Sequence, residues 1–502
     1  MQENTNRAIA YNSIILYAKM AITTVCALLS TRYALRALGV VDYGLYSVLG
    51  GIISIIAILN TIMVSTSNRF IAVAIGVGNI EEANRQFNVN LSIHVAIAFF
   101  VLFIAYPIGD WYIPRFVNYD GPMTNAMMVY CITTVGSIFS FIGVPYNGLL
   151  MAKEKFIVFC SIDVFSHVVR LVVSWLLLFC FEQKLLVYTV MMAIVHALPT
   201  LFYFMYCSIK YKEIVRVRIV RDKDLYKNVF GFSVWVGIGA LAHVGRNQGA
   251  ALIVNTFFST VMNAAMGVAS MVNNYVSMFA KNITQPMLPQ ITKSYAAGNE
   301  QRTQELLIMS TKYCYLMTLM VGSVFLVEPE WILSLWRGDV PPYSTIFLAL
   351  FVVDNLVLSL NDGVSNIIFA SGNISFYQIC SSLTNILAIV AGFFVLRGGA
   401  PAFFLLVAYI VVSIIRFFVI QWALHRTLDY DNRILFRHSY LPSLVTTLCF
   451  FPMIFIRTHL HPIFNIIIAI IYLSILVWYI GLNRDERNRI SSFVINKWRR
   501  GK

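Results

Sequence analysis

The sequence predicts an all-α polytopic membrane protein of about fourteen transmembrane helices. Hydrophobic residues make up 59% of the 502 positions and charged residues only 12%, whereas about a quarter of the residues of a soluble protein are charged. The apolar residues form runs of about 20, the length of helix that crosses ~30 Å of hydrocarbon. The alternating ten-residue segments typical of a transmembrane β-barrel are missing from the sequence. Lipid is therefore the expected solvent for most of the surface.

The first predicted span begins close to the N-terminus, and we expect it to stay uncleaved because it is too long for a signal-peptide core. Residues 229–286 exceed the length of one span at ~1.5 Å per residue. We therefore predict two helices there, with a break near Thr256–Asn263. The fourteen predicted spans cover residues 8–31, 43–66, 88–109, 125–147, 157–181, 185–207, 229–255, 264–286, 305–327, 342–363, 377–396, 401–424, 439–456 and 462–482.

The basic residues are unevenly distributed along the chain. The formal net charge of +14 could by itself indicate a nucleic-acid partner. Most of the 37 Lys and Arg residues, however, fall on one side of the predicted topology. The positive-inside rule makes that side the cytoplasm, where it places both termini and the Arg-rich segment 483–502. The charge thus orients the chain in the membrane, and no nucleic-acid partner is expected.

The chain contains an internal repeat. The pair Gly78-Asn79 after the second span recurs as Gly298-Asn299 after the eighth, and residues 151–156 correspond to 371–376 at the same offset of 220. Two matches at one offset predict two pseudo-symmetric six-helix bundles related by an axis along the membrane normal. The predicted domains are an N-terminal bundle, a basic cytoplasmic linker, a C-terminal bundle, and two additional helices with a basic tail, at residues 1–208, 209–228, 229–424 and 425–502.

Two permanent cations lie within predicted spans one and seven. Lys19 and Arg246 each belong to a helical stripe of small or polar residues, and His243 shares the stripe of Arg246. Small residues also let helices pack closely, which is the structural alternative, but packing does not explain a lysine so deep in a span. Ionisable groups in hydrocarbon face the protein interior or an aqueous cavity. We therefore expect Lys19 and Arg246 to line a cavity.

Further polar groups occur on other spans. Asn274 and Lys281 share one face of span eight, and Arg416 lies in span twelve. Both of these cations could equally snorkel to the membrane surface. Span five carries a polar ladder without a counterpart in the second half, made of Asp163, His167, Arg170 and Ser174. Its carboxylate could be a counter-charge or a functional group.

Carboxylates are scarce within the predicted spans. Asp354, in span ten, could pair with one of the buried arginines, or it could bind a coupling proton or sodium ion. Apart from Asp163, most of the remaining interior charge is cationic. A cationic cavity suits an anionic substrate, and arginine forks suit phosphate in particular.

Signatures of soluble enzymes are missing from the sequence. There is no phosphate-binding Gly-Lys-Ser/Thr loop and no His-Glu-x-x-His motif, and the eight cysteines show no metal-ligand spacing. We therefore expect a transporter without cofactor, metal or catalytic residues. A membrane-embedded polysaccharide polymerase or ligase is the enzyme alternative. Such proteins usually present a large periplasmic loop, and the longest connections on that side, 110–125 and 327–341, are short.

Short motifs beside spans one, two and four carry a resemblance to a known family. They are LGVVDYGLYS at residues 38–47, GNIE at 78–81 with its echo after span eight, and AKEKF at 152–156. With these motifs the chain resembles the Wzx-type polysaccharide flippases of the multidrug/oligosaccharidyl-lipid/polysaccharide (MOP) exporter superfamily. The resemblance extends over essentially the whole chain.

The resemblance implies a V-shaped pair of six-helix bundles around a central cavity. It implies alternating-access movement of an undecaprenyl-pyrophosphate-linked oligosaccharide from the cytoplasmic to the periplasmic leaflet, for O-antigen (lipopolysaccharide), capsule or exopolysaccharide biosynthesis. The expected location is the bacterial inner membrane, with polysaccharide-assembly proteins as possible partners. The expected substrate-binding residues are Lys19, Arg246, Arg170, His243, Asn274, Lys281 and Arg416, with Asp354 as a coupling-ion site or counter-charge.

The alternative within the same superfamily is an ion-coupled exporter of drugs or other cations, driven through Asp354. The sign of the cavity separates the two functions, because a cationic cavity repels a cationic substrate. The interior cations therefore favour the flippase.

Overall fold

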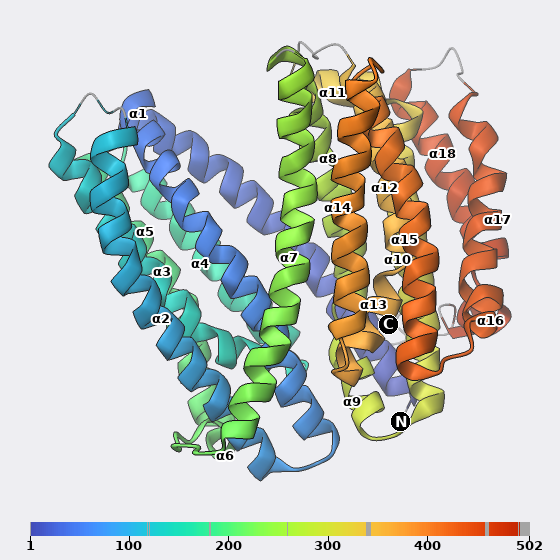
Figure 1. Cartoon of the computed structure of the whole chain (residues 1–502), viewed down its shortest axis with the longest axis horizontal. Coiled ribbons are helices and arrows are strands. Elements are labelled where there is room, and N and C mark those ends of the chain that lie inside the picture. The colour runs from blue at the N-terminus through green and yellow to red at the C-terminus, as the bar shows by residue number, and fades with distance from the viewer. Residues whose placement is uncertain are drawn as a thin grey trace, which may run out of the picture. The chain divides into compact units, whose positions relative to one another are not determined.

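A computed structural model describes residues 2–117, 119, 121–179, 182–258, 260–337, 343–456, 461–489 and 491. These residues form helices throughout and contain no strand (Figure 1). Eleven helices in this part of the chain are long and apolar enough to cross a membrane. The predicted fold class, an all-α polytopic membrane protein, is confirmed.

Three of the fourteen predicted spans are not among the eleven candidate spans. Predicted span two lies inside the long helix α1 (Gln2–Gly76), which contains the candidate span Ala8–Gly39 and the shorter apolar helix Ile62–Gly76. Predicted span eight is α8 (Thr260–Thr284), which is not among the eleven because of its polar face. Predicted span thirteen contains α17 (Leu441–Phe450), which is short because a π-helical turn precedes it and a 3-10 turn follows it.

Helical structure connects predicted spans one and two, and it continues through α1 except at Gly39, where φ is 78° and ψ is 175°. This conformation is open to glycine because it lacks a Cβ. The predicted break near Thr256–Asn263 is confirmed, since α7 (Lys223–Phe257) ends just before α8 begins.

The described residues divide into two compact units, which we call the N-terminal unit (residues 14–237) and the C-terminal unit (residues 1–13 and 238–502). The predicted domain boundaries at residues 208 and 228 stay predictions. Besides parts of α1 and α7, the N-terminal unit contains α2 (Ile80–Phe116), α3 (Met123–Ala152), α4 (Phe156–Leu176), α5 (Lys184–Lys210) and α6 (Lys212–Val215).

Close approach of α3 and α5 holds the N-terminal unit together. A Cβ added at Gly136 of α3 would lie 2.8 Å from the Cα of Ala193 in α5. Further along the same two helices, Gly143 of α3 faces Thr200 of α5. The Thr200 hydroxyl donates to the Phe139 carbonyl at 2.7 Å. Small residues let two backbones meet in this way where the hydrophobic effect does not drive helices together.

The C-terminal unit is built around α10, the most deeply buried of the candidate spans. In Figure 1 its helices α14 and α15 run side by side along most of their length. In addition to α8 and α17, the unit contains α9 (Met287–Ala296), α10 (Glu300–Val327), α11 (Pro329–Arg337), α12 (Ser344–Ser359), α13 (Asp362–Ser371), α14 (Ser375–Arg397), α15 (Phe404–Leu428), α16 (Asn432–Leu435) and α18 (Pro462–Leu476).

The two Gly-Asn pairs of the predicted repeat have the same local geometry. Gly78 and Gly298 end a helix with φ of 80° and 69°. Asn79 and Asn299 then begin the next helix, and each side chain accepts a hydrogen bond from the backbone N–H three residues later, at 2.9 and 3.0 Å. A left-handed glycine followed by an asparagine N-cap is a strong stop-and-restart signal. The sequence match thus reflects a structural match at these two turns.

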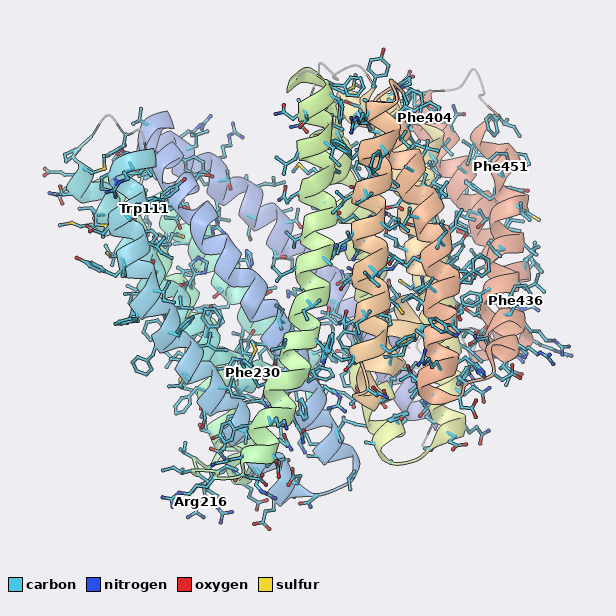
Figure 2. The ribbon with its side chains drawn as sticks, viewed as in Figure 1. Trp111, Arg216, Phe230, Phe404, Phe436 and Phe451 are labelled. Atoms are coloured by element: carbon cyan, nitrogen blue, oxygen red, sulfur yellow. The ribbon has the colours of Figure 1, made fainter. Side chains whose placement is uncertain are left out.

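Large apolar side chains cover the outside of each unit. Figure 2 shows Trp111 and Phe230 on the N-terminal unit and Phe404, Phe436 and Phe451 on the C-terminal unit. All five are at least 40% exposed. Exposed apolar surface on this scale is unfavourable in water but normal against lipid. The chain is accordingly a multi-pass membrane protein.

Candidate functional site

The N-terminal unit contains a polar pocket of about 350 Å³. It lies among α3, α4 and α5, with Val64 of α1 at its edge. The polar side chains that matter for its chemistry are Asn147, Asp163, His167, Arg170, His196 and Tyr203. A pocket lined by several convergent polar groups inside an apolar bundle is the default candidate for a binding site.

Helix α4 brings the polar ladder of the sequence into this pocket. Asp163, His167 and Arg170 are spaced by four and three residues, so they share one helical face, and all three line the pocket. Ser174, the next member, is buried beyond it, where its hydroxyl lies 3.1 Å from that of Ser30 and donates to the Arg170 carbonyl at 2.9 Å. Three of the four ladder residues thus line the pocket, and the fourth is buried beyond it.

Lys19 of α1 forms an ion pair with Asp163. The ammonium lies 2.6 Å from the carboxylate, and the two side chains are 21% and 27% exposed. The ammonium also lies 4.3 Å from the centroid of the Phe159 ring, close enough for a favourable cation–π contact. Asp163 is therefore the counter-charge of Lys19, which is one of the two roles that the sequence left open.

Arg170 has no such counter-charge. Within the described part of the chain, no carboxylate lies at ion-pair distance from its guanidinium. Three polar atoms at the pocket are shielded from solvent and make no hydrogen bond to the described residues: Arg170 Nε, His167 Nδ1 and Asn147 Oδ1. Buried polar groups are normally paired. The pocket thus offers a cation and unused hydrogen-bonding capacity to a ligand.

Arg246, the predicted cavity cation of α7, is fully compensated inside the C-terminal unit. It is 4% exposed, and its Nη2 donates to both carboxylate oxygens of Asp354 at 2.8 Å and to Ser413 Oγ at 3.0 Å. Ser413 in turn donates to Asp354 Oδ1 at 2.6 Å. The Tyr409 hydroxyl donates to the Arg246 carbonyl at 3.0 Å, and its ring centroid lies 4.8 Å from the guanidinium carbon. Of the two roles considered for Asp354, pairing with a buried arginine is the one that the contacts show.

The remaining predicted residues of the C-terminal unit are more accessible. His243, Asn274 and Lys281 are exposed, and His243 Nε2 lies 3.4 Å from the Asn247 side-chain nitrogen. Arg416 is half-buried and donates to Asn385 Oδ1 at 2.9 Å and to Ser381 Oγ at 2.8 Å. These hydrogen-bond partners are neutral, and no carboxylate of the described residues lies at ion-pair distance from Arg416, in contrast to Arg246.

Several polar groups at the pocket or in a buried ion pair were not identified from the sequence. His196 and Asn147 line the pocket beside Arg170, and both lie inside or at the end of predicted spans, which was the available signal. In the C-terminal unit, Lys312 of α10 is 1% exposed and lies 2.5 Å from Glu486. A lysine inside an apolar span requires such a partner, but the sequence alone does not identify it.

Comparisons with known proteins support the fold. No protein-family model matches the sequence, and no curated protein is detectably similar to it. A crystal structure of a MATE protein in the straight conformation matches with a TM-score of 0.74 at 13% identity, covering 84% of this chain and 97% of that one.

Two further solved structures agree. An outward-facing multidrug resistance MATE family transporter of the MOP superfamily has a TM-score of 0.69 at 14% identity, covering 84% of this chain and 96% of that one. A MOP superfamily transporter from Pyrococcus furiosus, described as having a binding pocket of reverse polarity that suggests a different function, has a TM-score of 0.70 at 13% identity with the same coverage. Likeness at such low identity concerns the fold alone: the chain has the fold of the MATE transporters of the MOP superfamily.

Proposed function

We propose that the protein is an alternating-access transporter that moves an anionic, lipid-linked oligosaccharide across the membrane. The observation that carries this proposal is the uncompensated Arg170 in the pocket of the N-terminal unit, beside His167 and His196. A guanidinium in a low-dielectric site attracts a phosphate oxygen far more strongly than it would in water. The MATE fold is compatible with a transport function.

The substrate that we propose is undecaprenyl-pyrophosphate-linked oligosaccharide. Its pyrophosphate would meet Arg170, and the first sugar would meet neutral polar groups such as Asn147, whose side-chain oxygen is unpaired. A volume of about 350 Å³ is at the small end of ligand pockets. It suits a phosphate with an adjoining sugar, while the lipid tail would stay among the hydrocarbon chains of the bilayer.

Lys19 would provide a second cation for the same head group. Its partner Asp163 lines the pocket, and both side chains are partly exposed. A partly solvated ion pair contributes little to stability, so a phosphate could replace Asp163 as the partner of Lys19 at small cost. On this proposal the ion pair holds Lys19 in position while the pocket is empty.

The predicted residues of the C-terminal unit would divide into two groups. His243, Asn274 and Lys281, which are exposed, and Arg416, whose charge is uncompensated, are proposed to contact the substrate. Arg246 is proposed to act structurally, because Asp354 and Ser413 already occupy its terminal nitrogen. This assigns substrate contact to the cations that lack a carboxylate partner or can exchange it.

The alternative, a cation-coupled exporter, would require Asp354 to accept a proton or sodium ion. Its carboxylate is already neutralised by Arg246 at 2.8 Å, so a coupling cation would have to displace a buried guanidinium. No observation at the site favours this function. The Pyrococcus furiosus protein, whose binding pocket of reverse polarity is described as suggesting a different function, is a precedent for variation in pocket polarity within this fold.

The proposed direction of transport is from the cytoplasmic to the periplasmic leaflet of the bacterial inner membrane, with both termini in the cytoplasm. The product would serve O-antigen, capsule or exopolysaccharide synthesis, together with polysaccharide-assembly proteins. These proposals follow from the positive-inside distribution of basic residues and from the resemblance to Wzx-type flippases.

Reconstituted flux tests the proposal directly. Proteoliposomes would carry a fluorescent lipid-linked oligosaccharide in one leaflet, and a membrane-impermeant glycosidase would report its arrival in the other. We expect Arg170→Ala to lower the rate roughly tenfold or more, since a charge-assisted hydrogen bond contributes about 1.5–3 kcal/mol. Arg170→Lys should retain part of the rate because the charge remains.

The matched control is Arg437→Ala, which removes an exposed arginine of the C-terminal unit and should leave flux unchanged. Wild-type flux in a folded Arg170→Ala protein would refute the site. Absence of glycan flux in the wild-type protein, combined with uptake of a cationic dye by the same vesicles, would refute the function in favour of the exporter.

A further inference from the structure

The connection between α5 and α7 contains a basic segment that hydrogen bonds and apolar packing attach to one end of the N-terminal unit. We call residues 216–222 the strap; they follow the short helix α6 and have no regular secondary structure. Figure 2 shows Arg216 at this end of the unit, directed away from the helices. Because α5 and α7 are both candidate spans, the strap lies where hydrocarbon gives way to lipid headgroups.

Buried residues on one side of the strap fix its position. Ile214 and Val215 of α6 are 4% and 8% exposed and belong to the same apolar core as Ala83 and Phe87 of α2. At the other end, Asp222 accepts a hydrogen bond from Arg85 at 2.7 Å. The strap is thus held to the bundle at both ends.

Two asparagines of α2 hold the backbone of the strap between these ends. Asn84 Nδ2 donates to the carbonyls of Ile214 and Arg216 at 2.8 Å, and Asn88 Nδ2 donates to the Arg216 carbonyl at 3.0 Å. The backbone N–H of Arg218 donates to Asn88 Oδ1 at 2.9 Å. Backbone polar groups that face the bundle are therefore satisfied within it, which leaves the side chains to face outward.

The outward side chains are of two kinds. Val217 and Ile219 are 73% and 87% exposed, among the most exposed large apolar residues of the protein. Arg216, Arg218 and Arg221 are exposed beside them, and Arg218 lies 3.5 Å from the Glu81 carboxylate in a solvent-exposed ion pair. The positive-inside rule accounts for the arginines. It does not account for two solvent-exposed aliphatic side chains on a backbone that is fixed by hydrogen bonds.

We propose that the strap is an interfacial anchor that binds anionic phospholipid headgroups. Its arginines contact phosphates, and Val217 and Ile219 insert into the boundary between headgroups and acyl chains. Basic residues combined with apolar ones are the composition that binds anionic membrane surfaces. Lipid is the occupant that matches both kinds of side chain and that always surrounds the adjoining spans. The anchor is independent of the transported substrate.

A spin-label experiment on the full-length protein tests the anchor. A nitroxide at Ile219→Cys would be compared with one at Glu213→Cys, an exposed polar position on neighbouring α6, with labelled wild-type protein as the blank. In nanodiscs of phosphatidylcholine and phosphatidylglycerol, we expect the label at 219 to collide more with oxygen than with a water-soluble nickel chelate. The label at 213 should show the opposite preference, and in pure phosphatidylcholine the label at 219 should shift toward the chelate.

Charge-matched variants separate the strap from general electrostatics. Arg216→Gln/Arg221→Gln leaves the backbone hydrogen bonds to Asn84 and Asn88 intact. It should lower the ratio of lipid-bound to water-exposed strap about fivefold per arginine. Arg433→Gln/Arg437→Gln removes two exposed arginines elsewhere and should change nothing.

Three results would overturn the proposal. The first is equal accessibility of position 219 with and without phosphatidylglycerol. The second is an unchanged accessibility in Arg216→Gln/Arg221→Gln. The third is a label that stays in water in every nanodisc and is protected only when an acidic protein partner is added.

Discussion

Two arginines, each within a candidate span, differ in whether they form an ion pair with a carboxylate. Arg246 is 4% exposed and shares two hydrogen bonds with Asp354, whereas the described residues offer Arg170 no carboxylate. A buried charge is tolerated when it is paired and hydrogen-bonded. This difference supports the structural role that we propose for Arg246 and the contact with a ligand that we propose for Arg170.

Removing Arg246 alone should be strongly destabilising. Arg246→Ala leaves Asp354 buried with Ser413 as its remaining hydrogen-bond partner among the described residues, and breaking a buried pair costs about 3–5 kcal/mol. The measurement is the free energy of unfolding in detergent by chemical denaturation. The double variant Arg246→Met/Asp354→Leu removes both charges and should recover most of the loss. A single variant as stable as the wild type would contradict the structural role.

In the N-terminal unit the backbones of α3 and α5 approach closely at Gly136, and a substitution there tests this contact. Gly136→Ala would place a Cβ 2.8 Å from the Cα of Ala193, so α3 and α5 would have to separate. We expect a loss of about 1–3 kcal/mol in the free energy of unfolding. In Gly231→Ala, where nothing lies within 4 Å of the added Cβ, the same exchange should stabilise by up to about 1 kcal/mol. Equal effects at both positions would refute the close approach.

The joint within α1 allows a prediction of a different kind. Gly39 has a φ of 78°, and nothing lies within 4 Å of a Cβ added there. The cost of Gly39→Ala is therefore conformational and should be about 1–3 kcal/mol, because a positive φ combined with a ψ near 180° is a backbone region that is essentially restricted to glycine. Gly39→Asn should cost a similar amount, since the tolerance of asparagine for positive φ is confined to the left-handed helical region. Thermal unfolding of the three proteins distinguishes this result from a joint without strain, in which the two variants would match the wild type.

The orientation of the whole molecule follows from its charge distribution. Most of the 37 Lys and Arg residues lie on one side of the predicted topology, which predicts a cytoplasmic location for the strap and both termini. A cysteine at exposed Arg216 should react with a membrane-impermeant maleimide only in inside-out vesicles. A cysteine at exposed Met123, on the predicted opposite side, should react in intact cells. Reaction of both from the same side would contradict the topology.

Much of the fold could be predicted because a bilayer imposes a simple rule on the sequence. Each span must be long, apolar and helical, so the helices α2, α3, α5 and α10 lie close to their predicted positions. The joint at Gly39 was not predictable in the same way, because the apolar pattern marks the two spans that meet there but not the helical structure that connects them.

The candidate site was predictable only in part. The spacing of Asp163, His167 and Arg170 identified one polar face of α4, because helical periodicity is local information. The neighbours His196 and Asn147 come from other helices, and their meeting with Arg170 depends on how α3 and α5 pack. No spacing within one helix contains that information.

The sequence by itself determined that this is a helical membrane protein with cations inside its spans. Composition, span length and the energetic cost of buried charge suffice for that conclusion. Only the tertiary structure decided which cation is neutralised, since Asp354 lies 108 positions from Arg246 and reaches it through the packing of separate helices. Charge compensation depends on distance in space. The same packing pairs Lys19 with Asp163 and, among the described residues, places no carboxylate at ion-pair distance from Arg170.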